Sequence, residues 1–396
     1  MRILGIVAEY DPFHGGHAWH LAEARRRAKA DYVVVIMSTC FTQRGEAALV
    51  PPADRAAMAL AGGADAVVAL PACWALRDAE HFALGGVHLL HALGADCIAF
   101  GAESDDLHGL QALARAIEVP PPSMLAAIHG RLDAGQSYPS ALHGALTLLM
   151  PEHAPLLASP NNTLAVCYLR AMLRLGADMT PVLIPRTGAY HDPSLSGELS
   201  SATAVRGALR RGDWDGVARA VPPTTLRVLR EAALSGRVMP AGGLDQALLY
   251  RLRTMSGEAW AALPGLSEGI EDRLRAAAQT APTREALLLA AKTRRYPYAR
   301  LSRLCAHALL QITQDQLDDT PLPPAAWLLG FRTEARPLLH RMKQGTVPLI
   351  AKAAAWDRQQ PWFRTELLAY DLWALGCGLP AGMGLTQGVV RLEPDV

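Results

Sequence analysis

Short runs of apolar residues recur along the first half of the chain, and helical stretches separate them. Each run has the length expected of a strand buried on both faces of a parallel sheet. The four runs, in chain order, are Ile3–Ala8, Tyr32–Met37, Ala66–Leu70 and Cys97–Phe100. The helical stretches are His17–Ala30, Ala53–Leu60 and Phe82–Leu93. Strands that alternate with helices predict an α/β fold with an open, Rossmann-like parallel sheet.

The pattern changes further along the chain. Residues 103–150 are helical in pattern and predict an excursion from the sheet, whereas Pro181–Pro185 is a further candidate strand. Beyond about residue 200, helical patterns dominate and few apolar runs suit buried strands. The stretch Pro321–Pro324 is expected to begin a small terminal unit. We therefore expect two domains, with a sheet domain at 1–206 and a mainly helical region at 207–396.

Composition indicates a globular protein of the cytoplasm. Hydrophobic residues make up 51% and charged residues 19%, as in well-packed globular chains. No stretch of about 18 uncharged apolar residues occurs, so we expect no membrane helix, and the N-terminus lacks the pattern of a secretory leader. The six cysteines are scattered and never form CxxC, which favours reduced thiols over zinc or disulfides.

Charge is distributed unevenly between the two halves. Residues 1–206 hold 14 basic and 19 acidic side chains, a net charge of −5, and residues 207–396 hold 24 and 18, a net charge of +6. A basic second half is compatible with binding a polyanion such as nucleic acid. It is equally compatible with arginines spread over solvated helix faces.

The segment Val7–His20, VAEYDPFHGGHAWH, carries the most informative chemistry. A strand ends in it, glycines turn the chain, and a helix begins beside His17. A helix N-terminus offers unpaired N–H groups and a partial positive charge, so it binds anions. His14 and His17 would add ring donors for phosphate oxygens. The residues alone leave three interpretations open: nucleotide binding, a purely structural turn, or a metal cluster that includes His20.

A second motif, Ser200–Arg206 (SSATAVR), lies where another helix is expected to begin. Ser200 or Ser201 is a candidate N-cap, and the first turn would present hydroxyl and N–H groups to an anion. Arg206 adds a permanent positive charge. Taken alone, the segment is also compatible with an ordinary capped helix.

Together the two motifs resemble those of the bacterial tRNA(Met) cytidine acetate ligases, whose N-terminal domain is of the HxGH nucleotidyltransferase type. Further segments continue the resemblance in the family's order over roughly 300 residues. They are Phe41–Glu46 (FTQRGE), Phe100–Ser104 (FGAES), Ser159–Leu164 (SPNNTL), Arg186 with Tyr190–Asp192, and Arg294–Tyr296.

The resemblance implies an ATP-dependent ligase that forms acetyl-adenylate and pyrophosphate from acetate and ATP. The acetyl group then passes to N4 of the wobble cytidine of elongator tRNA(Met). Acetate, with a pKa close to the ~4.3 of a Glu side chain, is an anion at neutral pH. It needs no general base, only positioning and charge neutralisation, with Mg²⁺ expected on the phosphates.

The resemblance also implies roles for individual residues. Catalysis is assigned to His14, His17 and Arg206. The expected ATP contacts are Val7, Ala8, Glu9, Tyr10, Asp11, Pro12, Phe13, His14, Gly15, Gly16, His17, Ala18, Trp19, His20, Gly101, Asn161 (in preference to Asn162), Arg186, Ser201 and Thr203. No residue is assigned to a protein-bound metal.

The segment 292–300 is the best local candidate for RNA binding because it combines basic and aromatic side chains. Its candidate contacts are Lys292, Arg294, Arg295, Tyr296 and Arg300. A solvated helix end is the alternative, since basic residues favour helix C-termini. For the similar basic run at 25–29 we prefer a solvated helix face.

The chain departs from the family at a few positions. The family more often has Asn where Asp11 and Gly15 stand, and a Gly is commoner at Thr39. Asp11 would bring a carboxylate near the phosphates, with an effect on metal use or ATP affinity. Two other functions are also compatible with the sequence: a small-molecule adenylyltransferase, and a non-catalytic RNA-binding protein that keeps the nucleotide fold.

Overall fold

The computed structural model describes residues 1–185, 201–266, 269–293 and 295–394. An eight-stranded sheet forms its centre, in the order β5-β4-β1-β2-β3-β6-β7, with β8 paired to β6. The strands are β1 (Ile3–Ala8), β2 (Tyr32–Ser38), β3 (Ala66–Leu70), β4 (Cys97–Ala102), β5 (Thr180–Pro185), β6 (Ala326–Arg332), β7 (Leu349–Ile350) and β8 (Val390–Leu392). Strands β1 to β5 pair in parallel. The parallel α/β sheet is therefore confirmed.

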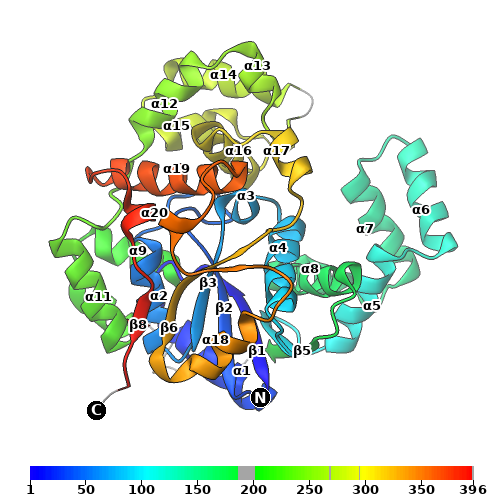
Figure 1. Cartoon of the computed structure of the whole chain (residues 1–396). Coiled ribbons are helices and arrows are strands. Elements are labelled where there is room, and N and C mark those ends of the chain that lie inside the picture. Colours follow the sequence, from blue (N-terminus) through cyan, green and yellow to red (C-terminus); the bar gives the residue numbers. More distant parts are fainter. Residues whose placement is uncertain (186–200, 267–268, 294, 395–396) are drawn as a thin grey trace.

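Helices cover both faces of this sheet (Figure 1). They are α1 (Gly15–Ala28), α2 (Pro52–Ala61), α3 (Ala72–Ala75), α4 (Ala79–Ala92) and α8 (Pro160–Leu175). Right-handed crossovers place α1 and α2 on one face and α4 and α8 on the other. Helix α4 lies close to β1 at Gly86, where an added Cβ would come within 2.7 Å of the Val7 side chain.

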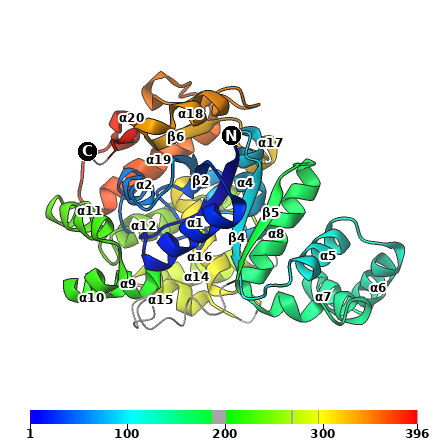
Figure 2. The same ribbon diagram turned by 90° about the horizontal axis from the view of Figure 1, so that it is seen from below.

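A helical excursion separates β4 from α8. It comprises α5 (Leu107–Glu118), α6 (Pro122–Asp133), α7 (Tyr138–Leu149) and the 3-10 helix η1 (Ala154–Ala158). Figures 1 and 2 both show α6 and α7 standing away from the rest of the molecule. Arg170 and Arg174 of α8 tie α5 to the body through ion pairs with Glu80 and Glu118, at 2.7–3.1 Å.

The next part of the chain is helical, as its pattern predicted. Its helices are α9 (Ala202–Arg210), α10 (Trp214–Ala220), α11 (Pro223–Leu234), α12 (Asp245–Thr254), α13 (Gly257–Ala261), α14 (Ile270–Thr280), α15 (Arg284–Ala291), α16 (Tyr298–Leu310) and α17 (Gln314–Asp319). Figure 1 shows α12 to α16 gathered beyond one end of the sheet. His307 of α16 bonds the carbonyl of Leu76, just after α3, at 3.0 Å, so this is the end where the parallel strands finish.

The last part of the chain returns to the sheet, which the sequence pattern did not predict. Strand β6 pairs antiparallel with β3, and Ala66 lies opposite Phe331. The expectation of a small terminal unit after Pro321–Pro324 is wrong, because that stretch leads directly into β6. The remaining elements are α18 (Arg336–Met342), α19 (Pro361–Gly376), α20 (Met383–Thr386) and the 3-10 helices η3 (Thr333–Ala335) and η4 (Ala353–Ala355). None of the described helices is long and apolar enough to cross a bilayer.

The 44–49 segment, which follows β2, is held by the second half of the chain. Arg284 and Ser302 donate to the carbonyls of Gly45 and Arg44 at its start. At its end, the backbone N–H of Met239 and the indole N–H of Trp373 donate at 2.8 and 2.7 Å. The conformation of a loop in the sheet domain therefore depends on the helical region.

Gly45→Ala tests this dependence. Gly45 has φ +77°, and an added Cβ would lie 2.6 Å from the backbone carbonyl group of Ser302. A matched control is Gly135→Ala, at φ +80° with nothing within 4 Å of the added Cβ. The left-handed backbone alone costs about 1–2 kcal/mol. Overpacking at Gly45 adds about 1–3 kcal/mol. We expect urea unfolding to show the larger loss for Gly45→Ala, and equal losses would contradict the close contact.

Candidate active site

The predicted site lies at a switch point of the sheet. Strand β1 is flanked by β2 on one side and β4 on the other, so the chain leaves β1 and β4 toward opposite faces. Open α/β sheets bind ligands in the crevice at such a point, outside the carboxyl ends of the strands. The HxGH loop (residues 9–17) follows β1, and Gly101 lies near the end of β4. Both segments therefore lie at the carboxyl ends of the two strands between which this switch point falls.

The two histidines of the HxGH loop cap helix α1. His14 is the N-cap, and its Nδ1 accepts the backbone N–H of Gly16 at 3.1 Å. The Nδ1 of His17 accepts the backbone N–H of His14 at 3.3 Å, which completes a capping box. The rings stack with their centroids 3.7 Å apart.

This capping fixes the tautomer of both rings. Because Nδ1 accepts a hydrogen bond, each neutral imidazole carries its proton on Nε2. The helix N-terminus beside them contributes a partial positive charge. The loop therefore places two Nε2–H donors at the end of α1 that carries this partial positive charge, which suits an anionic ligand.

Arg206 of α9 lies against the HxGH loop. Its Nη1 donates to the backbone carbonyl of Asp11 at 2.7 Å and lies 3.5 Å from the Asp11 carboxylate. Its Nη2 donates to the hydroxyl of Thr203 at 3.2 Å. Although 195 residues separate Arg206 from Asp11 in sequence, the two motifs therefore share one site.

The start of α9 has the predicted form. Ser201 is the N-cap, and its hydroxyl accepts the backbone N–H of Ala204 at 3.2 Å. Ser200 and Arg186 lie outside the described residues. The first turn of α9 therefore sets Thr203 and Arg206 on the side that meets the HxGH loop.

Asp11 anchors the loop. It is buried, and its carboxylate accepts the backbone N–H of Leu49 at 2.7 Å in addition to its contact with Arg206. Asp11 thus joins the HxGH loop to the 44–49 segment. The neighbouring Tyr10 has φ +48°, a strained backbone for a residue other than Gly and one that is common at functional sites.

Glu9 links the loop to the FTQRGE motif. Its carboxylate accepts the backbone N–H of Gln43 at 2.6 Å. Burial raises the pKa of Glu9 above its ordinary value, with the nearby Asp11 acting in the same direction and Arg55 in the opposite one. The loops after β1 and β2 are therefore joined through a side chain of the predicted ATP segment.

The asparagine pair begins helix α8. Asn162 is buried, and its Oδ1 accepts the backbone N–H groups of Glu103 and Ser104 at 2.9 and 3.1 Å. Asn161 donates to the Glu103 carboxylate at 2.5 Å. Burial opposes ionisation of Glu103, but the Asn161 side chain and the backbone N–H groups of Asn161 and Asn162 donate to its carboxylate and hold its pKa below the ordinary value. Asn162 thus shapes the backbone, while the partly exposed Asn161 stays our candidate for ATP.

Comparisons with known proteins agree with this geometry. A family model described as HIGH Nucleotidyl Transferase matches residues 1–378. The tRNA(Met) cytidine acetate ligase of Acetivibrio thermocellus is 33% identical, in a match that covers 98% of this chain and 100% of that protein. The tRNA(Met) cytidine acetate ligase of Syntrophomonas wolfei is 37% identical, in a match that covers 87% of this chain and 85% of that protein. The chain belongs to the tRNA(Met) cytidine acetate ligase family.

Solved structures of the family share the whole fold. Thermotoga maritima TmcAL, in a crystal form bound with alpha-thio ATP, is 28% identical and matches with a TM-score of 0.92. The match covers 99% of this chain and 100% of that chain. The apo form of the same protein also matches with a TM-score of 0.92, at 29% identity. The ligase family therefore has the same arrangement of sheet and helices as this chain.

Arg55 is a site residue that sequence reasoning missed. It is fully buried and donates to the backbone carbonyls of Glu9 at 2.6 Å and Val50 at 3.3 Å, and also to that of Thr39. One guanidinium therefore fixes the ends of the loops that follow β1 and β2. A single Arg in a helical stretch gives no sign of this role, because its partners are backbone atoms of distant loops.

The residues of the predicted RNA segment differ in exposure. Lys292 and Arg295 are exposed, but Tyr296 is only 5% exposed and the Arg300 guanidinium lies 5.8 Å from the centre of its ring. The Tyr296 ring is therefore covered, and its contact with RNA stays a prediction. Tyr298, two residues on, is the partly exposed aromatic of the segment. Arg294 lies outside the described residues.

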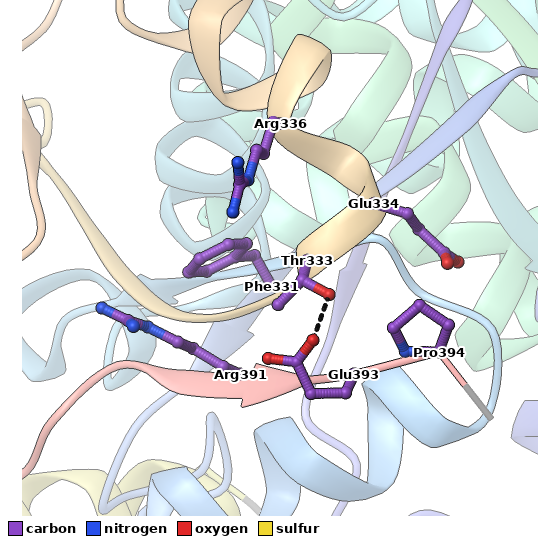
Figure 3. Close-up of a pocket in the computed structure, with 7 residues that line it drawn as sticks. All are labelled: Phe331, Thr333, Glu334, Arg336, Arg391, Glu393 and Pro394. Atoms are coloured by element: carbon purple, nitrogen blue, oxygen red, sulfur yellow. Dashed lines mark hydrogen bonds between the residues drawn. The ribbon is translucent and has the colours of Figure 1, made fainter. Parts of the chain in front are cut away.

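Two cavities mark different ends of the molecule. One, of about 530 Å³, is lined by Arg206, by the FTQRGE motif and by the helical region. The other, of about 570 Å³, is shown in Figure 3 and is lined by Phe331, Arg336 and Arg391, among others. Phe331 pairs with Ala66 at the start of β3. This second cavity therefore lies at the amino ends of the parallel strands, whereas the HxGH loop lies at their carboxyl ends.

No protein-held metal centre is evident in the described ranges. No group of three or more His, Cys, Asp or Glu side chains there could hold a metal ion. The two HxGH histidines use Nδ1 for capping. This geometry favours the interpretation of the histidines as anion ligands over the alternative of a metal cluster.

The role of Asp11 leads to a test by substitution. Asp11→Ala leaves the buried N–H of Leu49 without its acceptor, which costs about 1–3 kcal/mol of unfolding free energy. Asp11→Asn keeps an oxygen at this position and should cost less than about 1 kcal/mol. Denaturant unfolding of both variants measures the difference. Equal losses would show that the charge of Asp11, rather than its hydrogen bond, anchors the loop.

Proposed function

We propose that this chain is an ATP-dependent ligase that activates acetate as acetyl-adenylate and transfers the acetyl group to N4 of the wobble cytidine of elongator tRNA(Met). The observation that carries the proposal is the contact of Arg206 with the HxGH loop, at 2.7 Å from its Nη1 to the Asp11 carbonyl. It sets a permanent cation beside two imidazole donors and two helix N-termini. The names of the relatives and the alpha-thio ATP bound to the Thermotoga maritima protein support the same activity.

The first step needs a triphosphate held in place. Acetate attacks the alpha phosphorus of ATP, an acyl phosphate bond forms, and pyrophosphate leaves with the bonding electrons. His14, His17 and Arg206 neutralise the charge on the phosphate oxygens, and the α1 N-terminus adds its N–H groups. Nothing in this step requires a proton to be removed from acetate.

The remaining ATP contacts are assigned by position around the crevice. The segment Val7–His20 with Gly101 and Asn161 would line the nucleoside and phosphate side, and Ser201 and Thr203 would face the triphosphate from α9. Mg²⁺ fits this site as an ion bound through phosphate oxygens, because it keeps several waters and rarely uses an all-protein cage. There it would neutralise phosphate charge.

The second step needs an RNA surface beside the ATP site. Two exposed basic residues, Lys292 and Arg295, lie just before α16, and Arg300 lies in its first turn. Ser302 of the same helix contacts the 44–49 segment. Phosphate contacts by such residues would orient the anticodon loop, from which a base can be turned out. A tRNA substrate also implies a location in the cytoplasm.

One assay tests the proposal directly. We expect the protein, ATP and labelled acetate to produce N4-acetylcytidine in elongator tRNA(Met), AMP and pyrophosphate, measured by mass analysis of tRNA nucleosides. Acetate-independent adenylation of a small acceptor would instead support a small-molecule adenylyltransferase. If the folded protein binds tRNA but forms no product from any carboxylate, the non-catalytic alternative is correct.

His17→Ala separates catalysis from RNA binding. Loss of one donor to the developing charge should lower acetate-dependent ATP–pyrophosphate exchange by about 10²–10³-fold. The affinity for tRNA should stay within about twofold, because the residue does not contact RNA in the proposal. Filter binding and exchange assays measure the two effects. Unchanged exchange with weakened tRNA binding would reverse the assignment.

Arg295→Ala should give the opposite pattern. An exposed Arg that contacts an RNA phosphate contributes a salt-dependent part of the affinity, so its removal should weaken tRNA binding. The slope of log affinity against log salt concentration should also fall in magnitude by about one, because one counterion fewer is released. Acetate-dependent exchange should not change. Arg211→Ala, at an exposed position at the end of α9, serves as a control for the loss of one positive charge. If Arg295→Ala and the unaltered protein show equal salt slopes, Arg295 is not part of the RNA-binding surface.

A further inference from the structure

The cavity beside Arg206 lies between the two halves of the chain. Its volume of about 530 Å³ is within the range of about 300–1,000 Å³ typical of small-ligand sites. Thr203, Arg206, Gly207 and Arg210 line it from one face of α9, and Phe41, Gly45 and Glu46 line it from the FTQRGE motif. Helices α12, α15 and α16 supply much of the remaining wall. Residues from both halves therefore build it.

Arg206 connects this cavity to the HxGH loop. The side chain lines the cavity, while its Nη1 donates to the Asp11 carbonyl at 2.7 Å. The guanidinium of Arg206 thus lies between the cavity and the loop that precedes α1. That arrangement suits two reactants that must meet.

The interior of the cavity combines an apolar wall with a few polar groups. The apolar side chains are Met239, Leu244, Leu248, Cys305, Ala306 and Leu309. Such a wall with a small number of fixed polar groups is typical of sites for flat organic ligands. Tyr298 also lines the cavity and belongs to the basic segment assigned to RNA, so the cavity is continuous with that surface.

Glu46 is one of three carboxylates that line the cavity, together with Asp245 and Glu285. The Glu46 side chain has no hydrogen bond or ion pair with the described residues, whereas the Glu285 carboxylate accepts a hydrogen bond from the Tyr298 hydroxyl. The loop that carries Glu46 is rigid, because Arg284 donates to the Gly45 carbonyl at 3.0 Å and Ser302 holds the Arg44 carbonyl. A preorganised acceptor thus stands in a cavity that has an apolar wall on one part of its surface and charged groups on the rest.

We propose that this cavity receives the extruded acceptor cytosine, with its exocyclic N4 amino group donating to Glu46. The inference rests on the proposed function and adds the subsite of the second substrate. The amine is a hydrogen-bond donor and matches a carboxylate acceptor. The apolar wall replaces the stacking that the base loses on leaving the RNA loop.

The cavity also accounts for the fate of the proton in the second step. The lone pair of N4 attacks the acyl carbon of acetyl-adenylate, and a C–N bond forms. The C–O bond to the phosphate breaks, and AMP leaves with that electron pair. Glu46 takes the proton that N4 loses, which restores a neutral amide. Arg206, between the two subsites, stabilises the charge on the departing phosphate.

A blocking variant tests the assignment. Ala241 lines the cavity yet is exposed, so Ala241→Trp adds a ring at the opening without filling the core. Ala233→Trp, on an exposed position of α11 outside the cavity, is the matched control. We expect Ala241→Trp to reduce acetyl transfer to tRNA by about a hundredfold, through misplacement of the base. Acetate-dependent ATP–pyrophosphate exchange should stay within twofold of the control in the same preparation.

Glu46→Gln tests the chemical role separately. It keeps the size of the side chain and removes the proton acceptor, so transfer should fall by about 10²–10⁴-fold. Acetate-dependent exchange and thermal melting should stay unchanged. Single-turnover transfer, the exchange assay and thermal melting of the same preparation measure these effects.

The outcomes distinguish the subsite from the activity itself. Normal transfer by Ala241→Trp would overturn the cavity assignment, and normal transfer by Glu46→Gln would overturn the role of its carboxylate. Loss of exchange together with transfer in Ala241→Trp would place the cavity in the adenylate site instead. If the unaltered protein supports neither exchange nor transfer, the proposed function fails, not the subsite alone.

Discussion

The contact between the Arg206 guanidinium and the Asp11 carbonyl determines how the site is assembled. It brings the start of α9 against a loop that precedes it by 195 residues, at 2.7 Å. Without it, the imidazoles of the HxGH loop and the cation of α9 would belong to separate surfaces. The family relationship indicates the activity, and this contact brings together the two short motifs that we assign to the triphosphate.

Supporting contacts hold both sides of that junction. Asp11 accepts from Leu49, Arg55 fixes the carbonyls of Glu9 and Thr39, and Met239 donates to the backbone of the 44–49 segment. Most of these bonds join elements far apart in sequence. The helical half is therefore a structural part of the active site, and the proposed acceptor cavity is a consequence of the same packing.

The sequence predicted those features that depend on local pattern. Four apolar runs correspond to β1 to β4, and the capped start of α9 at Ser201 follows from its serines. Strand β6 was missed, because a short apolar run with Trp and Leu is equally compatible with a buried helix. The anchoring of Asp11 to the Leu49 N–H has no local signal, because Leu49 lies 38 residues further along the chain. The burial of Tyr296 leaves no local signal in the sequence. The hydrogen bonds of Arg55 leave none either, because their acceptors are backbone carbonyls of distant loops.

A double-mutant cycle on ATP binding tests the central claim most directly. The affinity of ATP is measured by calorimetry for His17→Ala, Arg206→Ala and the combined variant. If both side chains hold one triphosphate, each change weakens binding and their effects are coupled by about 0.5–3 kcal/mol. Strictly additive losses, or an affinity unchanged by either substitution, would contradict a shared site.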